Sequence, residues 1–453
     1  MRAAASRLAL LLLAGCIATR RLPDDVPVVT APPPTTITAP RDTAPTAEPV
    51  PQDEAPERTR ESAFDVRVAL PRSVATTTIT ATGSWRLYDA RDAVLLRALP
   101  AEPWQIEAAG SKVRAVRFDG TATPWQEGYV TARVDGEPEL LRLGQRRYRG
   151  ALRVFATDSG ALVVNILPLE SYLRGVVPLE IGGPRAPNEQ AAVEAQAIAA
   201  RSYTVVRRAA ALRSAARAAF YDLLASTSDQ VYGGVEAERA FSDAAVASTR
   251  GQVLRYGGRV VDAPYHASCG GETAAPSEVW GSGVSGYLRR VDDRIPGTSD
   301  RYYCDIAPRF AWTRSVTGNE LAASMERYLR TLTAVPAGGP GRARTLSIDG
   351  RTGSGRVARL TLGAERGTFS IRGNDARSVL RAAGGEALPS AYFSLDTETG
   401  PDGAIARVTI RGNGFGHGVG MCQWGAIGRA RAGFDVRSIL RAYYPGTEIG
   451  GID

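Results

Sequence analysis

The chain has 453 residues, 44% hydrophobic and 23% charged, which is enough for one large domain or two to three smaller ones with buried cores. Its net charge is +8, carried almost entirely by arginine because Lys112 is the one lysine. The basic residues are spread out, and no helix-turn-helix, zinc-finger or RNA-binding pattern occurs, which argues against a nucleic-acid partner. The charge fits the codon bias of an Ala/Arg/Gly-rich genome, or an anionic partner such as cell-wall polymer or a membrane surface.

The first residues have the pattern of a bacterial lipoprotein signal peptide. Two arginines precede an apolar run, residues 8–13, that is too short to span a bilayer. Small residues then lead to Cys16, which predicts a signal peptide over residues 1–16 and a lipid on this cysteine. Because Ile17 follows in place of aspartate, resemblance to lipoproteins of double-membrane bacteria favours the outer membrane. We expect an exported protein, lipid-anchored and facing the periplasm.

Residues 17–62 are rich in Pro, Thr, Ala and Asp and lack apolar periodicity, which predicts a disordered tether. A β-rich module is expected over residues 63–160, because hydrophobic and polar residues alternate there in short runs separated by Gly, Pro or Asp. This module carries no catalytic constellation, and we expect it to be a scaffold. The alternating runs are 64–70, 77–81, 85–88, 112–118 and 147–155.

The next stretch predicts a strand, a short helix and a longer helix. An apolar run over 161–167 leads into a helix over 171–177. Glu180 follows on a turn between a proline and two glycines, a position that suits an acid facing a groove. The second helix is alanine-rich, with Asn188 as its N-cap, and is expected to run to about Arg208.

One face of this second helix carries polar residues seven positions apart. Glu189, Gln196 and Tyr203 share that face. The stripe is either an exposed polar surface or the wall of the groove that Glu180 faces. Further along, Gln230 lies in the segment Asp-Gln-Val-Tyr (229–232). This segment matches a signature of the family that the chain resembles (see below), in which the element faces the groove; the alternative is a buried tyrosine with satisfied polar neighbours.

Both histidines of the chain lie in glycine-rich segments. His266 belongs to YHASCGGET (265–273), and His417 to GNGFGHGVGMCQWGA (412–426). Bare glycine backbone either packs tightly or approaches a ligand closely. The second segment fits neither a dinucleotide loop nor a phosphate loop in its spacing. A Ser/His or Cys/His hydrolase lacks support, since neither a G-x-S-x-G elbow nor a papain-like signature occurs.

The segment between these motifs predicts regular structure without catalytic chemistry. A helix is expected over 318–331 and a second over 374–380. Strands are expected at 346–349, 356–363 and 367–372. The predicted fold class is α+β, with β-rich modules around a mixed helix and strand core.

Residues 167–208 and the two glycine-rich motifs together resemble the family of stage II sporulation protein D and the amidase enhancer LytB. The resemblance covers about 380 residues, from Ala63 onward. It implies a catalytic region with a substrate groove over 161–453, including a β-rich insertion at about 340–400. It also implies peptidoglycan glycan strands as substrate, and cell-wall remodelling as the process.

The resemblance implies lytic transglycosylation, in which a hydroxyl of the muramic sugar replaces water. One carboxyl can then protonate the leaving oxygen and later deprotonate the attacking hydroxyl. Glu180 matches this catalytic position, and its apolar neighbours are expected to raise its pKa. Glu170 is better explained by the positive end of a helix. The residues expected to bind substrate are Gln196, Arg201, Tyr203, Gln230, Tyr265, His266, Ser268, His417 and Gln423.

The alternative is a non-catalytic peptidoglycan-binding protein that stimulates a cell-wall amidase, as the name amidase enhancer implies. Glu180 separates the two hypotheses, because a pure enhancer does not need this acid. A third hypothesis, a scaffold that tethers wall to membrane, leaves the Gly/His motif unexplained.

Three cysteines remain if Cys16 carries lipid. In an oxidising compartment we expect a disulfide between Cys269 and Cys304, which leaves Cys422 free. Zinc at His266 and Cys269 is the alternative, although two ligands are too few for a structural site. Cys304, Cys422 or His417 could complete that ligand set. We therefore expect no cofactor.

Overall fold

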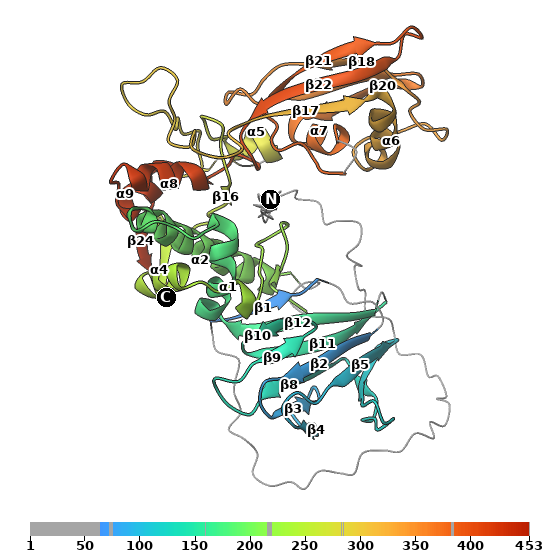
Figure 1. Ribbon diagram of the computed structural model, residues 1–453, viewed down its shortest axis with the longest axis vertical. Coiled ribbons are helices and arrows are strands. Elements are labelled where there is room, and N and C mark those ends of the chain that lie inside the picture. The colour runs from blue at the N-terminus through green and yellow to red at the C-terminus, as the bar shows by residue number, and fades with distance from the viewer. Residues whose placement is uncertain are drawn as a thin grey trace, which may run out of the picture. The chain divides into compact units, whose positions relative to one another are not determined.

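The computed structural model describes residues 64–71, 76–158, 160–214, 220–281, 283, 285–381 and 385–452 (Figure 1). The predicted signal peptide, Cys16 with its expected lipid and the whole predicted tether lie outside the described residues. The described chain combines helices with several sheets, so the predicted α+β class is confirmed.

The described chain divides into two compact units. The first unit contains the described parts of 64–178, 190–264 and 446–452, and the second contains 179–189 and the described parts of 265–445. A boundary near residue 160 was expected. Strands β11 (Ala151–Thr157) and β12 (Gly160–Pro168) form an antiparallel hairpin across that position, so the chain does not divide there.

The first unit contains two large sheets, in which the predicted two-residue alternation is visible. In β2 (Thr76–Ala81), for example, every second side chain is buried. β12 is buried along most of its length because it lies between β1 (Asp65–Ala69) and β11. One sheet has the strand order β13-β1-β12-β11-β8-β3-β4 and the other β10-β9-β2-β5-β6-β7. The further strands are β3 Trp85–Tyr88, β4 Val94–Ala98, β5 Trp104–Ala109, β6 Lys112–Val116, β7 Gln126–Glu127, β8 Tyr129–Val134, β9 Leu141–Leu143, β10 Arg146–Tyr148 and β13 Leu223–Leu224.

Helices and a third sheet complete the first unit. α2 (Gln190–Leu212) packs against α4 (Ala240–Ser248) and against β14 (Gln252–Tyr256). β14 pairs with β15 (Arg259–Val260) on one side and with β24 (Glu448–Gly451) on the other. A short 3-10 helix, η2, spans Val235–Ala237.

The second unit contains two three-stranded sheets, β17-β22-β21 and β18-β19-β20, against which α6 and α7 pack (Figure 1). Their shared core holds Trp312, Leu321, Leu360 and Phe393 among other buried side chains. The predicted helices and strands of residues 318–380 are all present, and their ends differ from the predicted ones by at most three residues. The elements are β17 Ala311–Thr317, α6 Gly318–Tyr328, η3 Leu329–Thr331, β18 Ala343–Ile348, β19 Arg359–Ala364, β20 Gly367–Arg372, α7 Gly373–Val379, β21 Phe393–Thr399 and β22 Ile405–Asn413.

The rest of the second unit surrounds a two-stranded parallel pair, β16 (Tyr265–His266) with β23 (Met421–Cys422). This pair joins the two glycine-rich motifs that were recognised in the sequence. The remaining elements are η1 Pro187–Glu189, α5 Pro276–Trp280, α8 Gln423–Arg431 and α9 Val436–Tyr443.

Helix α1 (Leu169–Ile181) is longer than predicted. The expected end at residue 177 is wrong because Pro178 lies inside the helix. A proline removes one backbone hydrogen bond from a helix but does not always end it. The helix stops before Gly182, whose φ of 68° is the left-handed conformation that commonly terminates helices. Glu180 is therefore in the last turn of α1 and not in a separate turn.

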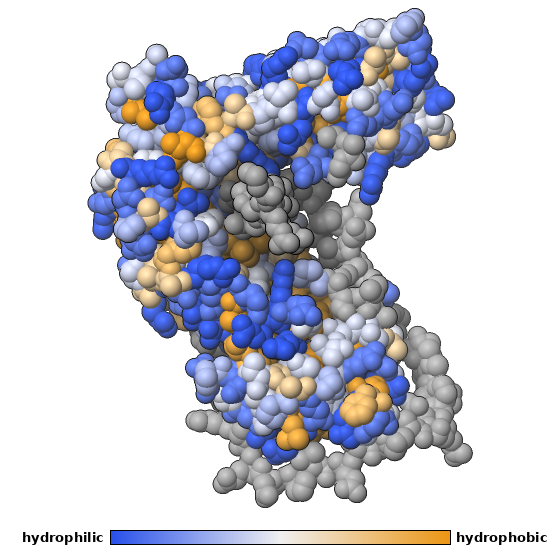
Figure 2. Space-filling model, viewed as in Figure 1, coloured by the Kyte–Doolittle hydropathy of each residue, from blue (hydrophilic) through white to orange (hydrophobic). Residues whose placement is uncertain are grey.

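The face of the molecule in Figure 2 is mostly hydrophilic, with hydrophobic residues in small separate groups. Within the described part of the chain, no helix has the length and apolar character that crossing a bilayer requires. The large hydrophobic side chains that are exposed are Phe64, Leu99, Phe118, Leu212, Tyr256 and Phe434.

Candidate functional site

Glu180 is buried, with 2% of its surface exposed. Two side chains, those of Arg185 and Glu189, attach the segment that follows Glu180 to helix α8. Arg185 donates hydrogen bonds to the carbonyl oxygens of Ile181 (2.6 Å) and Gly182 (3.0 Å), which satisfies acceptors at the carboxyl end of α1. The Arg185 guanidinium also lies 5.1 Å from the ring centroid of Trp424 on α8. The last turn of α1 is thus tied to the helix that follows the Gly/His motif.

Glu189 provides the second attachment. Its carboxylate accepts a hydrogen bond from the amide of Ala186 (3.0 Å) and forms an ion pair with Arg431 of α8, with 2.6 Å between Oε1 and Nη2. The Glu189 side chain is only 4% exposed. The residue was predicted to lie on an exposed stripe or a groove wall. It is instead a buried anchor between η1 and α8.

The two glycine-rich motifs lie side by side. Ser268 forms a bridge with Phe415, and Ala274 with Val419. A Cβ atom at Gly416 would lie 2.8 Å from the Cβ of His266, and φ at this glycine is 106°. Only glycine combines that conformation with that approach. The glycines therefore serve close packing between the motifs, which was one of the two sequence interpretations.

This packing brings both histidines together, with 5.5 Å between ring centroids. The Val419 amide donates to Nδ1 of His417 (3.0 Å), and Nδ1 of His266 donates to the Val419 carbonyl (3.2 Å). A carbonyl only accepts, so the proton of His266 is assigned to Nδ1 and its Nε2 carries a lone pair. The ring of Trp280 also lies close to that of His417, with 5.3 Å between the ring centroids.

Both imidazoles are held in the neutral form. Burial, and after it the charge of Arg377, lowers the pKa of His417 to about 3. Burial, followed by His417 and Arg356, lowers the pKa of His266 well below its usual value. These rings can therefore accept or donate hydrogen bonds at neutral pH but do not carry charge.

Two buried polar atoms of this loop have no hydrogen-bond partner among the described residues. They are Nε2 of His266 and Oγ of Ser268, and both residues are 2% exposed or less. Buried polar atoms of this kind usually have a water or ligand as partner. A lone pair and a hydroxyl on one loop suit a hydroxyl-bearing ligand.

Two buried arginines bind backbone carbonyl oxygens in the second unit, and one of them, Arg356, holds the loop that carries His266. Arg356 donates to the carbonyls of Cys269 (3.0 Å) and Glu272 (3.1 Å), and Arg377 donates to those of Leu388 and Pro389. Burial lowers the pKa of Arg377 to about 10. Sequence inspection missed both residues, because no local motif marks an arginine that will bind backbone carbonyls.

Four residues that were expected to bind substrate lie in the first unit, and all are buried. Arg201 is 0% exposed and ion-pairs with Glu170, with 2.7 Å between Nη2 and Oε2. It also donates to the carbonyls of Val246 and Gln252. In this structure the guanidinium of Arg201 is held inside the first unit by contacts with α1, α4 and β14, and its expected role in substrate binding stays a prediction.

The other three have defined surroundings too. Gln230 accepts hydrogen bonds from Tyr172 (3.1 Å) and Thr204 (2.8 Å), and it is 0% exposed. Tyr203 donates to Asp229 (3.1 Å). Gln196 is 0% exposed on α2. For Gln230 the interpretation as part of a satisfied buried cluster fits this structure better than a groove-facing role.

The predicted disulfide is not formed. The sulfur atoms of Cys269 and Cys304 are 3.4 Å apart, and both are thiols. The two cysteines of the predicted pair do lie together, and Cys422, which was named as a possible further zinc ligand, joins the same buried cluster. Asp293, the fourth member of the cluster, was not predicted. His266 is not in this cluster, so the alternative ligand pair of His266 and Cys269 is not assembled. Burial raises the pKa of the Cys269 and Cys422 thiols well above the usual range.

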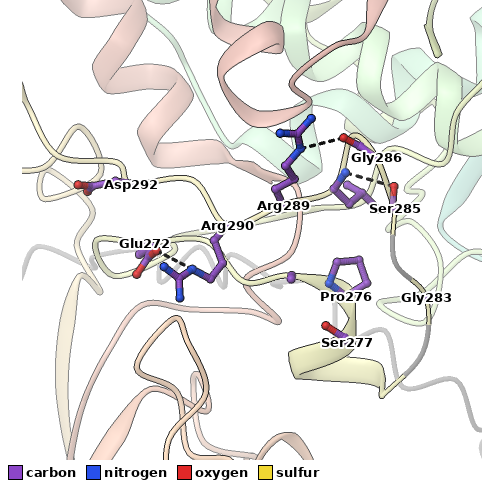
Figure 3. Close-up of a pocket in the computed structure, with 11 residues that line it drawn as sticks. Glu272, Pro276, Ser277, Gly283, Ser285, Gly286, Arg289, Arg290 and Asp292 are labelled. Carbon is purple, nitrogen blue, oxygen red and sulfur yellow. Dashed lines mark hydrogen bonds and ion pairs between the residues drawn. The ribbon is translucent and has the colours of Figure 1, made fainter. Parts of the chain in front are cut away.

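A pocket of about 710 Å³ opens beside the first motif (Figure 3). Glu272 and Arg290 form an ion pair in its wall, with 3.0 Å between Oε1 and Nε. None of the residues predicted to bind substrate lines it. The lining residues are Glu272, Ala275, Pro276, Ser277, Gly283, Ser285, Gly286, Leu288, Arg289, Arg290 and Asp292.

The fold and this site define an α+β protein with a buried acid at a helix end and a pair of neutral histidines between two glycine-rich motifs. A family model described as stage II sporulation protein matches residues 157–256, and one described as a domain of unknown function (DUF8618) matches 290–420. The chain is 30% identical over 302 residues to stage II sporulation protein D of Bacillus subtilis, covering 64% of this chain and 76% of that protein. The chain belongs to the family of stage II sporulation protein D.

Two further relatives are similar over long stretches. An uncharacterized protein of Brachyspira hyodysenteriae is 30% identical over 388 residues, which cover 85% of this chain and 92% of that protein. The amidase enhancer of Bacillus subtilis is 28% identical over 311 residues, which cover 61% of this chain and 40% of the enhancer. This chain therefore spans less than half of the enhancer's length.

Proposed function

We propose that this protein remodels the bacterial cell wall by cleaving peptidoglycan glycan strands through lytic transglycosylation. The observation that carries the proposal is the position of Glu180. It is buried in the last turn of α1, and Arg185 and Glu189 tie the segment after it to α8. This segment belongs to the same compact unit as His266, Ser268 and His417.

In the proposed reaction, Glu180 first donates its proton to the glycosidic oxygen, and the bond from that oxygen to the muramic sugar breaks. The sugar's own hydroxyl attacks the same carbon and closes an anhydro ring, and its proton returns to Glu180. No water is consumed and the enzyme ends in its starting protonation state.

The neutral histidine pair has a binding role in this proposal. His266 Nε2 and Ser268 Oγ offer an acceptor and a donor to hydroxyl or amide groups of a sugar. Because burial keeps the imidazoles uncharged, they supply hydrogen bonds and leave proton transfer to Glu180.

The test is product analysis on intact and peptide-stripped glycan strands by mass spectrometry. Wild type should release anhydro-muramic ends, and Glu180→Gln should reduce their rate at least 100-fold. Glu194→Gln is the matched control, since it makes the same change on the neighbouring helix α2, where the carboxylate accepts from Ser248. Hydrated reducing ends would mean a hydrolase with a second carboxylate, and uncleaved strands would reject the enzyme.

The second candidate is a non-catalytic enhancer of a cell-wall amidase. Two observations favour it: the similarity to the amidase enhancer, and the burial of all the residues that were expected to bind substrate. Adding the protein to a purified cell-wall amidase should then raise amide hydrolysis, and Glu180→Gln should raise it equally well.

For localisation we propose export and a lipid on Cys16 that anchors the protein to the outer membrane. The supporting observation is the signal-peptide pattern of residues 1–16. Metabolic labelling with a fatty-acid analogue should mark the protein, and Cys16→Ser should abolish the label. Labelling of both forms, or of neither, contradicts the anchor.

A further inference from the structure

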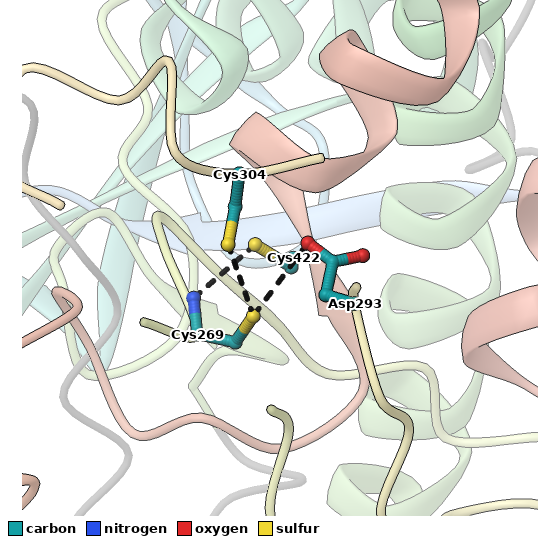
Figure 4. Close-up of side chains that lie close together, drawn as sticks. All are labelled: Cys269, Asp293, Cys304 and Cys422. Carbon is teal, nitrogen blue, oxygen red and sulfur yellow. Dashed lines mark hydrogen bonds between the residues drawn. The ribbon is translucent and has the colours of Figure 1, made fainter. Parts of the chain in front are cut away.

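Three cysteines and one aspartate converge on a single point of the second unit (Figure 4). They come from separate segments: Cys269 follows β16, Asp293 and Cys304 lie in the chain between α5 and β17, and Cys422 ends β23. All four residues are 0% exposed. Their sulfur and carboxylate oxygen atoms lie within 4.8 Å of one another.

We propose that Cys269, Cys304, Cys422 and Asp293 form a structural zinc site. Zinc in proteins takes four ligands in a tetrahedron, with zinc–sulfur distances of about 2.3 Å, which places ligand sulfurs about 3.8 Å apart. Here the Cys269 and Cys304 sulfurs are 3.4 Å apart, and the Cys269 sulfur is 3.7 Å from Oδ2 of Asp293. No two of the four ligand atoms are more than 4.8 Å apart, so shifts of about an ångström or less bring them to the separations that a tetrahedral zinc requires.

The ligand atoms are oriented by a second layer of hydrogen bonds, as in metal sites generally. Oδ1 of Asp293 accepts from Tyr443 (2.7 Å) and Arg429 (3.1 Å), which leaves Oδ2 directed at the cysteines. The Cys422 sulfur accepts from the amides of Cys269 (3.2 Å) and Gly425 (3.3 Å). Amide donors and the amino end of α8 both stabilise a thiolate.

Charge favours an ion over four neutral groups. Three thiolates and a carboxylate with a divalent cation leave two negative charges. Two buried arginines adjoin the cluster: Arg429, which pairs with Asp293, and Arg356, which donates to the Cys269 carbonyl. Buried charges are tolerated where opposite charges neutralise them.

The donor set selects zinc among common ions. Magnesium and calcium take oxygen ligands, whereas a site dominated by thiolate sulfur suits zinc. Since all four ligands come from the protein and the site is closed to solvent, its role is structural and not catalytic. The ion would fasten the loop of His266 and the motif of His417 to the chain around Asp293.

The test begins with the metal content of the purified full chain, measured by inductively coupled plasma mass spectrometry. We expect one zinc per chain, retained through gel filtration. Cys422→Ser and Asp293→Asn should each lower the zinc content at least tenfold. His266→Ala should retain zinc, which separates this ligand set from one built on His266.

Two further measurements use the wild-type protein, so they do not depend on whether the variants fold. Wild type refolded with cobalt(II) in place of zinc should show the intense absorption of thiolate-to-cobalt charge transfer. Alkylation of the denatured protein under non-reducing conditions should modify Cys269, Cys304 and Cys422 in full after chelation. The proposal is overturned if the purified protein contains no zinc and also fails to bind added zinc or cobalt. It is equally overturned if the mass of the chain is two hydrogens below that of the fully reduced form and two of these cysteines resist alkylation because they form a disulfide.

Discussion

Glu189 and Arg431 are 242 positions apart in the sequence and form an ion pair with 2.6 Å between oxygen and nitrogen. The carboxylate is nearly buried while the guanidinium is about half exposed. The pair joins the short segment that carries Glu180 to the helix that follows the Gly/His motif.

We expect Arg431→Ala to lower the free energy of unfolding by about 1–2 kcal/mol, because a buried carboxylate loses a charged hydrogen-bond partner. Arg437→Ala, on the exposed face of α9, is the control and should change it by less than about 0.5 kcal/mol. Chemical denaturation measures both. A double-mutant cycle with Glu189→Gln should show coupling, and additive effects would contradict the pairing.

Substitution of Arg201 tests whether this residue stabilises the fold or binds substrate. Arg201→Met should cost about 3–5 kcal/mol of stability, because Glu170 is left without its partner in a largely buried place. The double variant Arg201→Met with Glu170→Leu should recover part of that loss, since both charges are gone. The exposed Arg213→Met is the control. A variant that loses glycan binding but keeps full stability would restore the substrate role that the sequence suggested.

Acid should destabilise the fold through His417. Its pKa is about 3 in the folded protein and about 6.5 when exposed, so only the unfolded chain binds the proton between these values. Stability is therefore complete above about pH 6.5 and falls as pH decreases, with a slope of at most about 1.4 kcal/mol per pH unit from this group. After burial, the charges of Arg377 and Arg356 also oppose a positive imidazole at His417. His266 adds to the loss of stability in acid, because its own pKa is lowered well below the usual value, mainly by burial.

His417→Gln should flatten this slope when unfolding is measured from pH 8 to pH 5. The matched control is wild type at pH 8, where both forms are uncharged at this position. If the stability of the variant falls with decreasing pH as steeply as that of wild type, a group other than His417 causes the loss of stability in acid.

Gly416→Ala should destabilise the protein by about 2–4 kcal/mol, since the new Cβ meets the Cβ of His266 at 2.8 Å and φ is positive. Gly433→Ala is the matched control. That glycine also has a positive φ, 89°, but open space where the Cβ would be, so its cost should be about 1 kcal/mol. Thermal unfolding compares the two, and equal losses would mean that the contact with His266 is not limiting.

The sequence predicted best those elements whose signals are local. The helix beginning at Gly318 has a capping box, in which Thr317 accepts from the Glu320 amide and Glu320 reaches back to Thr317. The strands β19 and β20 are short, and each buries two side chains that are two positions apart. Such elements depend little on the rest of the chain, so their bounds were predicted to within a few residues.

Which polar side chains are buried could not be predicted from local sequence patterns. Arg201 and Gln230 are completely inside because partners from distant segments, Glu170 and Tyr172, satisfy them. The same limit applied to the cysteines: the count suggested one pair, whereas the fold adds a third thiol and a carboxylate. Pro178 misled the helix assignment because a proline's tolerance depends on what surrounds the broken backbone bond.

The strand β24 has a consequence for the order of biosynthesis. Residues 448–451 pair with β14, whose Val253 and Leu254 are almost fully buried, yet β24 is made about two hundred residues later. While the second unit is being synthesised, the edge of β14 therefore stays unpaired and open to wrong partners. The first unit can be completed only after translation has passed through the second. A chain arrested before residue 448 therefore lacks the last strand of its first unit. Chaperones that bind exposed strand edges would act on that intermediate.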